Sequence, residues 1–395
     1  MIFPKDLPRI DALIRAQESM TSLTRADVEA MQLDKLNALL AREKARGGYY
    51  AALPERLDSL EALSSLPFTT DEQLAANAAG LLLRSQAEVS RVLSDATSGT
   101  TGAAKRVFYT EGDCARTVEL FMAGLGELVF PGGVTAICFP FTGPYGLGEL
   151  IAEAIEGLGA RPLKVGAAFS YGEWAELLAK ERPDTFVGMP VQLLRLLRVC
   201  GKGSLERALV SADACPAAVI EGCEAILGAR LFPHYGSREM ALGGAISCPA
   251  HAGMHLRENH VIAEIVDAEG KPLPPGERGE LVITTIGMEA MPLIRYRTGD
   301  YTRILPGRCP CGSAVLRLDA VSRGEESAEL ASLDELLFRL PFVADYRAER
   351  KDGRLRLEVL TCGEGALPPL DADVTLRPVR AEDGPLCRGK RRIES

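Results

Sequence analysis

The feature that most constrains the fold is a regular alternation of short apolar runs with amphipathic stretches in the middle of the chain. Residues 134–139, 185–189 and 208–211 are strand-length runs of mostly apolar side chains. Residues 147–157 and 191–199 lie between these runs and carry apolar side chains at helical spacing. Strands that alternate with helices in this way indicate an α/β fold with a largely parallel sheet.

The two ends of the chain have different patterns. Residues 6–47 mix charged and apolar side chains at helical spacing and stop at a pair of glycines, which predicts helix. Thr70 is expected to cap the N-terminus of a further helix. After about residue 255, the β-rich residues 260–267 and 279–285 flank a Pro/Gly turn, which predicts antiparallel strands or a small barrel.

From residue 323 onward we expect a short α+β segment. Its helix is expected near residues 333–340, and its strands near residues 343–350 and 354–361. A polar tail is expected to follow them.

Composition narrows the class of protein. The chain has 395 residues, a net charge of −9 and 47% hydrophobic residues. It contains no apolar run of about 18 residues, so we expect no membrane span. An acidic balance without a basic stripe argues against a nucleic-acid partner. Ten cysteines in a chain of this length are unlike a secreted disulfide scaffold, and the N-terminus lacks a signal pattern, which predicts a cytoplasmic location.

Residues 97–105 combine hydroxyl residues, two glycines and a lysine, a composition suited to binding a polyphosphate. Glycines let the backbone N–H groups approach an anion, hydroxyls add donors, and a lysine adds charge. The spacing is not that of a Walker A loop, and an ordinary flexible turn is the alternative. The candidate phosphate ligands are Thr97, Ser98, Gly99, Thr100, Thr101, Gly102 and Lys105.

Further motifs follow this loop in a recognisable order. Residues 235–239 read Tyr-Gly-Ser-Arg-Glu, residues 276–281 read Gly-Glu-Arg-Gly-Glu-Leu, residues 296–300 read Tyr-Arg-Thr-Gly-Asp, and residues 389–390 read Gly-Lys. Together they resemble the motifs of the adenylate-forming superfamily.

Within that superfamily the chain resembles the phenylacetate–coenzyme A ligase branch, because of three further stretches. These are residues 67–70 (Pro-Phe-Thr-Thr), residues 253–255 leading into residues 264–267, and residues 291–296 (Met-Pro-Leu-Ile-Arg-Tyr). The resemblance implies a large N-terminal adenylation domain over residues 1–322, with mostly parallel sheets and a small β-barrel-like subdomain. It also implies a small, shortened α+β C-terminal lid domain over residues 323–395.

The resemblance implies that a carboxylate attacks the α-phosphate of ATP to give an acyl-adenylate, and that a thiol then displaces AMP. Glu239 would ligate Mg²⁺, with a solvated surface acid as the alternative. Lys390 would bridge the carboxylate and the α-phosphate, with a solvated basic tail as the alternative. Asp300 would accept hydrogen bonds from the ribose hydroxyls. The residues implied to line the adenine and ribose are Tyr235, Gly236, Ser237, Ser211, Ala212, Asp213 and Arg323.

The same resemblance locates the acid-binding pocket between residues 141–146 and residues 234–236. Its candidate lining residues are Phe141, Tyr145, Gly146 and His234. An aryl or arylacetic acid is expected, although either ring could equally be a core residue.

Four residues match a structural zinc site. Cys309 and Cys311 form a tight Cys-x-Cys turn, and Cys248 is followed by His255 with six residues between them. Three thiolates and an imidazole make a closed tetrahedral Zn²⁺ set. His251 is the competing nitrogen ligand, and four unconnected reduced residues are the alternative.

The last seventy or so residues depart from the superfamily pattern, because the strand and loop that help the thiol half-reaction are missing or shrunken. Coenzyme A is the acceptor expected by default. A carrier-protein thiol or a small amine is one alternative acceptor, and a non-catalytic nucleotide- or acyl-adenylate-binding protein is an alternative of another class. The oligomeric state is left open, with a homodimer as one option.

Overall fold

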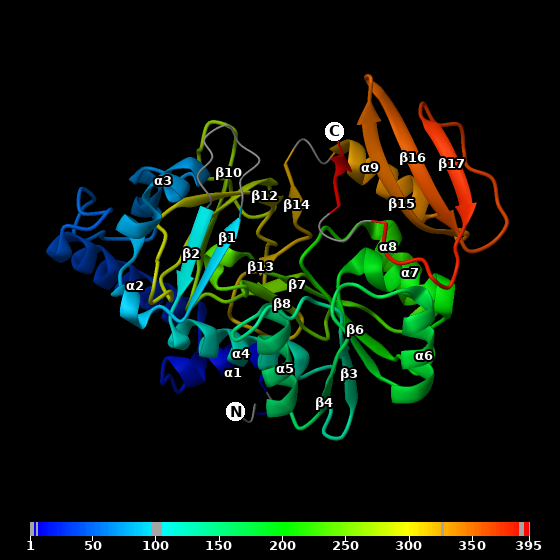
Figure 1. The fold of residues 1–395 in the computed structure, drawn as a ribbon. Coiled ribbons are helices and arrows are strands. Elements are labelled where there is room, and N and C mark those ends of the chain that lie inside the picture. Colours follow the sequence, from blue (N-terminus) through cyan, green and yellow to red (C-terminus); the bar gives the residue numbers. More distant parts are fainter. Residues whose placement is uncertain (1–3, 5–6, 96–104, 325–327, 387–390, 395) are drawn as a thin grey trace. The chain divides into compact units, whose positions relative to one another are not determined.

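The chain folds into two units, and each unit combines two separate stretches of sequence (Figure 1). Unit 1 spans Met1–Gly124 and Tyr235–Val321, and unit 2 spans Leu125–His234 and Ser322–Ser395. The computed structural model describes residues 4, 7–95, 105–324, 328–386 and 391–394. In that part of the chain, no helix is both long and apolar enough to cross a membrane.

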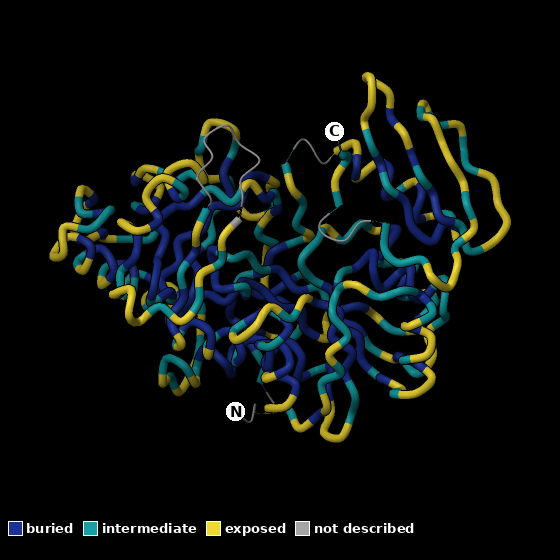
Figure 2. The backbone as a smooth tube through the Cα atoms, in the orientation of Figure 1, coloured by how far each residue is buried: buried dark blue, intermediate teal, exposed yellow. Residues whose placement is uncertain are grey.

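Unit 2 contains the strand–helix alternation expected from the sequence. Its first stretch contains β3 (Val134–Ile137), α5 (Leu147–Gly157), β4 (Arg161–Lys164), α6 (Tyr171–Glu181), β5 (Thr185–Gly188), α7 (Pro190–Cys200), β6 (Arg207–Val210), α8 (Ala217–Leu227) and β7 (Phe232–Tyr235). The strands pair in parallel in the order β4-β3-β5-β6-β7. Every residue of β5 is buried, as is typical of a parallel strand covered on both faces (Figure 2). The α/β prediction is confirmed.

The C-terminal stretch of unit 2 is a small α+β segment. It contains β14 (Ser322–Arg323), α9 (Ala328–Phe338), β15 (Val343–Lys351), β16 (Arg354–Thr361), β17 (Asp373–Pro378) and β18 (Ile393–Glu394). The expected helix and the two expected strands are confirmed. The polar tail contains two strands that were not expected from the sequence: β17 pairs in parallel with β16, and β18 pairs in parallel with β15. β17 is almost entirely exposed, and its alternating apolar residues Val374 and Leu376 stay at the surface.

One hydrophobic core joins the two stretches of unit 2. Leu194 of α7 and Val219 of α8 belong to the same buried cluster as Leu337 of α9 and Tyr346 of β15. The predicted boundary at residue 322 coincides with the change from unit 1 to unit 2, yet the residues after it share their core with residues 125–234. The division into an N-terminal and a lid domain stays a prediction.

Unit 1 begins with helices whose ends follow local rules. Its elements are α1 (Arg9–Gln17), α2 (Arg25–Arg46), η1 (Glu61–Ser65), α3 (Asp71–Leu81), η2 (Gln86–Glu88), β1 (Arg91–Asp95), β2 (Lys105–Tyr109), α4 (Glu111–Leu125), η3 (Arg238–Met240), β8 (Ala245–Ser247), β9 (Met254–Leu256), β10 (Ile262–Val266), β11 (Gly279–Thr284), β12 (Tyr296–Thr302) and β13 (Arg317–Leu318). Thr70 caps α3 through a capping box with Gln73, as expected. Gly47 ends α2 in the left-handed conformation, with φ +64°.

The strands of unit 1 pair antiparallel in three groups. β1 pairs with β2, β13 with β9 and β9 with β8, and β11 lies between β10 and β12. Antiparallel strands were one of the two structures predicted for residues 260–267 and 279–285, and the pairing of β10, β11 and β12 confirms that alternative. A bulge between Glu280 and Val282 shifts the register of β11 against β12.

Candidate active site

Glu239 is held in a sharp turn at η3. A Cβ on Gly236 would lie 2.1 Å from the carbonyl oxygen of Leu242, so only glycine fits there. The hydroxyl of Tyr109 donates a 2.6 Å hydrogen bond to the carbonyl oxygen of Arg238. These contacts fix a backbone turn that buries the Glu239 side chain, whereas Ser237 beside it is half-buried. The surface-acid alternative for Glu239 is therefore wrong.

Lys105 is the partner of Glu239. Its Nζ lies 2.7 Å from Glu239 Oε1, 3.1 Å from Asp71 Oδ1 and 3.0 Å from the hydroxyl of Tyr296. Lys105 is expected to bind phosphate and Glu239 a metal ion, and the structure brings the two side chains together. Asp71 and Tyr296 were missed as partners, because neither residue carries a local signal of a contact with Lys105.

Both members of this pair are charged at neutral pH. Burial alone would raise the pKa of Glu239, but the charge of Lys105 and its hydrogen bond bring that pKa below its ordinary value. Burial alone would lower the pKa of Lys105, but Glu239 and Asp71 bring it above its ordinary value. A charged ammonium can bind a polyphosphate, and a charged carboxylate beside it can ligate a hard cation.

Tyr235 and Asp300 form a second buried pair. The hydroxyl of Tyr235 donates a 2.7 Å hydrogen bond to Asp300 Oδ2. Asp300 follows Gly299, which takes a left-handed conformation with φ +68°, and its N–H donates to Thr298 Oγ1 at 3.0 Å. The Tyr-Gly-x-x-Glu and Tyr-Arg-Thr-Gly-Asp motifs are thus in direct contact, as expected if they serve one nucleotide.

Arg295 joins the three stretches that pointed to one branch of the superfamily. Its guanidinium forms a bidentate pair with Glu264, at 2.9 and 3.0 Å, and is 2% exposed. It also donates to the carbonyl oxygens of Ser64 and Leu66, at 2.8 and 2.6 Å, and lies 4.1 Å from the ring centroid of Phe68. The Arg295 side chain therefore fixes the start of β12. The first residue of that strand, Tyr296, contacts Lys105.

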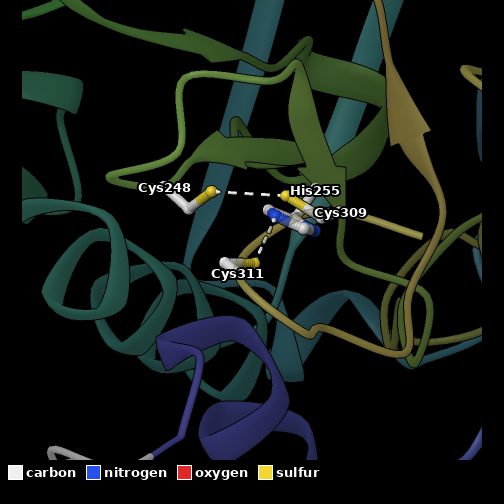
Figure 3. A group of neighbouring side chains, drawn as sticks. All are labelled: Cys248, His255, Cys309 and Cys311. Carbon is white, nitrogen blue, oxygen red and sulfur yellow. Dashed lines mark hydrogen bonds between the residues drawn. The ribbon is translucent and has the colours of Figure 1, made fainter.

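Three cysteines and a histidine of unit 1 lie together (Figure 3). The ligand atoms of Cys248, His255, Cys309 and Cys311 are all within 4.8 Å of one another, and His251 is not in the group. The Sγ atoms of Cys248 and Cys309 are 3.7 Å apart, and Cys311 Sγ lies 3.4 Å from His255 Nε2. A tetrahedral zinc ion with ordinary bond lengths needs edges of about 3.6–3.8 Å. The alternative of four unconnected residues is wrong, and the donor set fits zinc.

The other site residues belong to unit 2, where Ser211 contacts His234. Ser211 Oγ lies 2.8 Å from His234 Nδ1, and Ala212 takes a left-handed conformation with φ +72°. Burial lowers the pKa of His234 to about 4, so its imidazole is neutral at pH 7. Asp213 Oδ2 accepts a 3.2 Å hydrogen bond from the backbone N–H of Arg391.

The predicted acid-pocket loop is partly buried. Phe141 and Tyr145 are both half-buried, and Tyr145 has φ +61°. The ring of Phe141 lies 5.5 Å from Lys164 Nζ, and a Cβ on Gly148 would meet it at 2.8 Å. Gly146 is the N-cap of α5. Neither ring is a fully buried core residue.

Several predicted residues give no test of their role. Thr97 to Gly102 and Lys390 lie outside the described residues. Arg323 is exposed and lies on β14 in unit 2. Arg391, which follows Lys390 in the sequence, is not among the predicted site residues, yet its side chain is only 6% exposed.

Comparison with known proteins agrees with this geometry. The family model described as AMP-binding enzyme matches residues 71–290. The phenylacetate–coenzyme A ligase of Thermus thermophilus is 31% identical over 330 residues, which cover 77% of this chain and 72% of that protein. The protein of the same name from Escherichia coli K12 is 31% identical over 284 residues, which cover 68% of this chain and 63% of that protein.

Among solved structures, 2-hydroxyisobutyryl-CoA ligase in the postadenylation state, in complex with 2-HIB-AMP, matches with a TM-score of 0.75. Its sequence is 17% identical, and the match covers 99% of this chain and 94% of that chain. At this identity the likeness establishes the fold alone.

The fold and the paired motifs define an AMP-binding enzyme. Within that class, the chain belongs to the phenylacetate–coenzyme A ligase family.

Proposed function

We propose that this protein activates a carboxylic acid with ATP and then transfers the acyl group to coenzyme A. A carboxylate oxygen attacks the α-phosphorus of ATP and pyrophosphate leaves. The coenzyme A thiol, having lost its proton, then attacks the acyl carbon and AMP leaves. The observation that carries this proposal is the pair of buried contacts, Lys105 with Glu239 and Tyr235 with Asp300, in one unit of a family member.

Lys105 and Glu239 would serve the triphosphate end of ATP. Lys105, together with the residues of the loop before it, would hold the β- and γ-phosphates. Glu239 offers a buried, ionised oxygen ligand, which fits Mg²⁺. Bound Mg²⁺ would neutralise charge on the triphosphate. Because Lys105 and Glu239 now contact each other, ATP binding must redirect the ammonium from the carboxylate to phosphate.

Asp300 and Tyr235 would serve the nucleoside end. A buried carboxylate can accept hydrogen bonds from both ribose hydroxyls, and the Tyr235 hydroxyl fixes its orientation. The ring of Tyr235 would stack on adenine.

The acid would be an aryl or arylacetic acid. The half-buried rings of Phe141 and Tyr145 offer apolar surface, and the neutral imidazole of His234 brings no fixed charge to the pocket. Lys390, carried by a C-terminal domain of residues 323–395, would then bridge the acid and the α-phosphate and balance the developing charge.

The four-residue cluster would hold a structural zinc ion. All four ligands are protein side chains, so no coordination position stays open for catalysis. Zinc would fasten the loop that carries Cys309 and Cys311 to the hairpin of β8 and β9.

Pyrophosphate exchange separates an adenylating enzyme from a nucleotide-binding protein. The protein is incubated with ATP, Mg²⁺, labelled pyrophosphate and, in turn, phenylacetate, benzoate and 2-hydroxyisobutyrate. Acid-dependent formation of labelled ATP is expected with at least one aryl acid. Silence across a broad acid panel, with ATP still bound, would favour the binding protein.

Product analysis then separates the acceptors. The active acid is tested with coenzyme A, with a phosphopantetheine-bearing carrier protein and with a small amine. An acyl-coenzyme A product is expected. A product formed only with the carrier or the amine would replace coenzyme A in the proposal.

Metal analysis tests the zinc site without an activity assay. Purified protein is expected to contain about one zinc ion per chain. Cys309→Ser should lose that zinc and lower the melting temperature, whereas Cys200→Ser, which changes a cysteine outside the cluster, should keep it. Zinc-free native protein would remove the metal from the proposal.

A further inference from the structure

The C-terminal tail contains a buried arginine within a run of basic residues. The side chain of Arg391 is 6% exposed, whereas its neighbour Arg392 is exposed to solvent. A solvated basic tail would expose both residues. The burial of one of two adjacent arginines indicates that the fold selects position 391.

The pocket around Arg391 is built for a guanidinium. One Nη atom lies 2.7 Å from Asp334 Oδ1, and the other lies 3.7 Å from Asp345 Oδ1. The guanidinium carbon lies 4.2 Å from the ring centroid of Tyr346 and 4.8 Å from that of Phe338. A planar cation that stacks on rings and pairs with carboxylates fits this pocket, and a lysine ammonium does not reproduce both contacts.

The acidic side of the pocket is itself held in place. The hydroxyl of Tyr346 donates a 2.5 Å hydrogen bond to Asp334 Oδ1. Asp345 Oδ2 accepts a 3.1 Å hydrogen bond from the N–H of Leu386 and lies 3.4 Å from Nη1 of the buried Arg195. Two guanidinium groups thus balance two buried carboxylates, and loss of either cation would leave buried negative charge without compensation.

The backbone at this residue is tied to the 211–213 loop. The N–H of Arg391 donates to Asp213 Oδ2 at 3.2 Å, and Asp213 Oδ1 also accepts the N–H of Ala214. Two residues further on, β18 begins to pair with β15, with Ile393 opposite Ala348. The chain is therefore fixed directly after position 390 by a side chain, a backbone hydrogen bond and a strand.

We propose that Arg391 is a positioning residue for adenylation: its buried guanidinium sets the register of residues 391–394 beside the 211–213 loop, and the reactivity of Lys390, the preceding residue in the sequence, depends on that register. Residues 390, 391 and 392 are all cations, so charge alone cannot define which one enters the pocket. A slip of one residue would exchange the inward and outward positions of a strand. The two rings and two carboxylates distinguish a guanidinium from a lysine ammonium, so they select Arg391 over the preceding residue type. This inference rests on the proposed function.

The test compares Arg391→Met and Arg391→Lys with Arg392→Met, a matched change at the exposed neighbour. Acid-dependent pyrophosphate exchange is measured with ATP and with the acid that is active for the native protein. A misplaced catalytic group is expected to lower kcat about 10- to 100-fold, with little change in the KM for ATP. Arg392→Met should keep the native rate. A native kcat in both Arg391 variants would overturn the inference.

A double-variant cycle with Lys390→Ala separates positioning from a general structural role. If Arg391 acts through Lys390, Arg391→Met added to Lys390→Ala should cause no further loss of rate. An equal fractional loss in both backgrounds would overturn the inference, because Arg391 would then act independently of Lys390. If Arg391→Met fails to fold, Arg391→Lys decides by the same criteria, since it keeps the charge. A native protein without exchange activity would instead refute the proposed function.

Discussion

Two buried arginines, one in each unit, each lie next in sequence to a residue of a predicted motif. Arg295 precedes Tyr296 in unit 1, and Arg391 follows Lys390 in unit 2. Each guanidinium stacks on an aromatic ring and pairs with a carboxylate. The same combination of ring stacking and ion pairing therefore holds residue 295 in one unit and residue 391 in the other.

The two arginines differ in how much each contributes to its unit. Arg295 makes a bidentate pair with Glu264 and donates to two carbonyl oxygens. Arg391 has one short ion pair, with Asp334, and shares the more distant Asp345 with Arg195. We infer that Arg295 mainly stabilises the fold, whereas Arg391 mainly sets the position of the tail.

The largest expected effect is that of Arg295→Ala on stability. Removing one partner of a buried ion pair leaves the other as an unpaired buried charge, which lowers the free energy of unfolding by about 3–5 kcal/mol. Denaturant unfolding measures the change. Arg303→Ala breaks an exposed pair with Asp319 in the same unit and should change the free energy by less than about 1 kcal/mol. Equal effects at the two positions would refute the structural role of Arg295.

Glu239→Gln tests whether the pair of Lys105 and Glu239 in unit 1 takes part in adenylation. Loss of the carboxylate charge removes the proposed Mg²⁺ ligand and should lower the adenylation rate about 100- to 1,000-fold, on the scale seen for lost electrostatic stabilisation. The matched control is Glu18→Gln, which neutralises the carboxylate of another lysine–glutamate pair, with Lys35 at 2.6 Å. Pyrophosphate exchange over a range of Mg²⁺ concentrations measures both. A native rate in Glu239→Gln would exclude the metal role.

A pH titration tests the burial of His234 in unit 2. Its pKa is about 4 in the folded protein, against about 6.5 when unfolded, so between these values the unfolded state binds the extra proton. The free energy of unfolding should therefore fall as the pH drops from about 6.5 to about 4, by up to about 3 kcal/mol from this residue. Denaturant unfolding across this range measures it. His234→Gln should lack that part of the slope, and an unchanged slope would show that the imidazole is not buried as a neutral group.

The smallest expected effect is that of Asp300→Ala on nucleotide affinity. Loss of hydrogen bonds from two ribose hydroxyls to a charged group should weaken ATP and AMP alike, about 10-fold or somewhat more. Calorimetric titration with both nucleotides measures it. Asp319→Ala, which removes a carboxylate that pairs with Arg303 instead, should leave both affinities unchanged. Weakening of ATP alone would move Asp300 from the ribose to the phosphates.

Local rules account for the parts of the fold that the sequence predicted well. The cap at Thr70 and the stop at Gly47 depend on neighbouring residues only, and buried parallel strands such as β5 are marked by continuous apolar runs. The strand β17 escaped prediction because it is held by backbone hydrogen bonds to β16 and buries little side-chain surface.

The candidate site residues also divide into those that stand in short motifs and those whose partners are distant in the sequence. Glu239, Asp300 and the cysteine cluster stand in short motifs, so their chemistry could be recognised before any contact was known. Asp71 as a partner of Lys105, and Asp334 as a partner of Arg391, lie 34 and 57 residues away in the chain and carry no local signal. Such contacts depend on which segments the fold brings together.

The sequence by itself determined the family and most of the elements, because these follow from residue type and short-range spacing. Only the tertiary structure decided that Lys105 and Glu239 are held charged against each other, and that Arg391 rather than Arg392 is buried. The reason is that burial, which sets both pKa values and the cost of an unpaired charge, is a property of packed segments and not of any single residue.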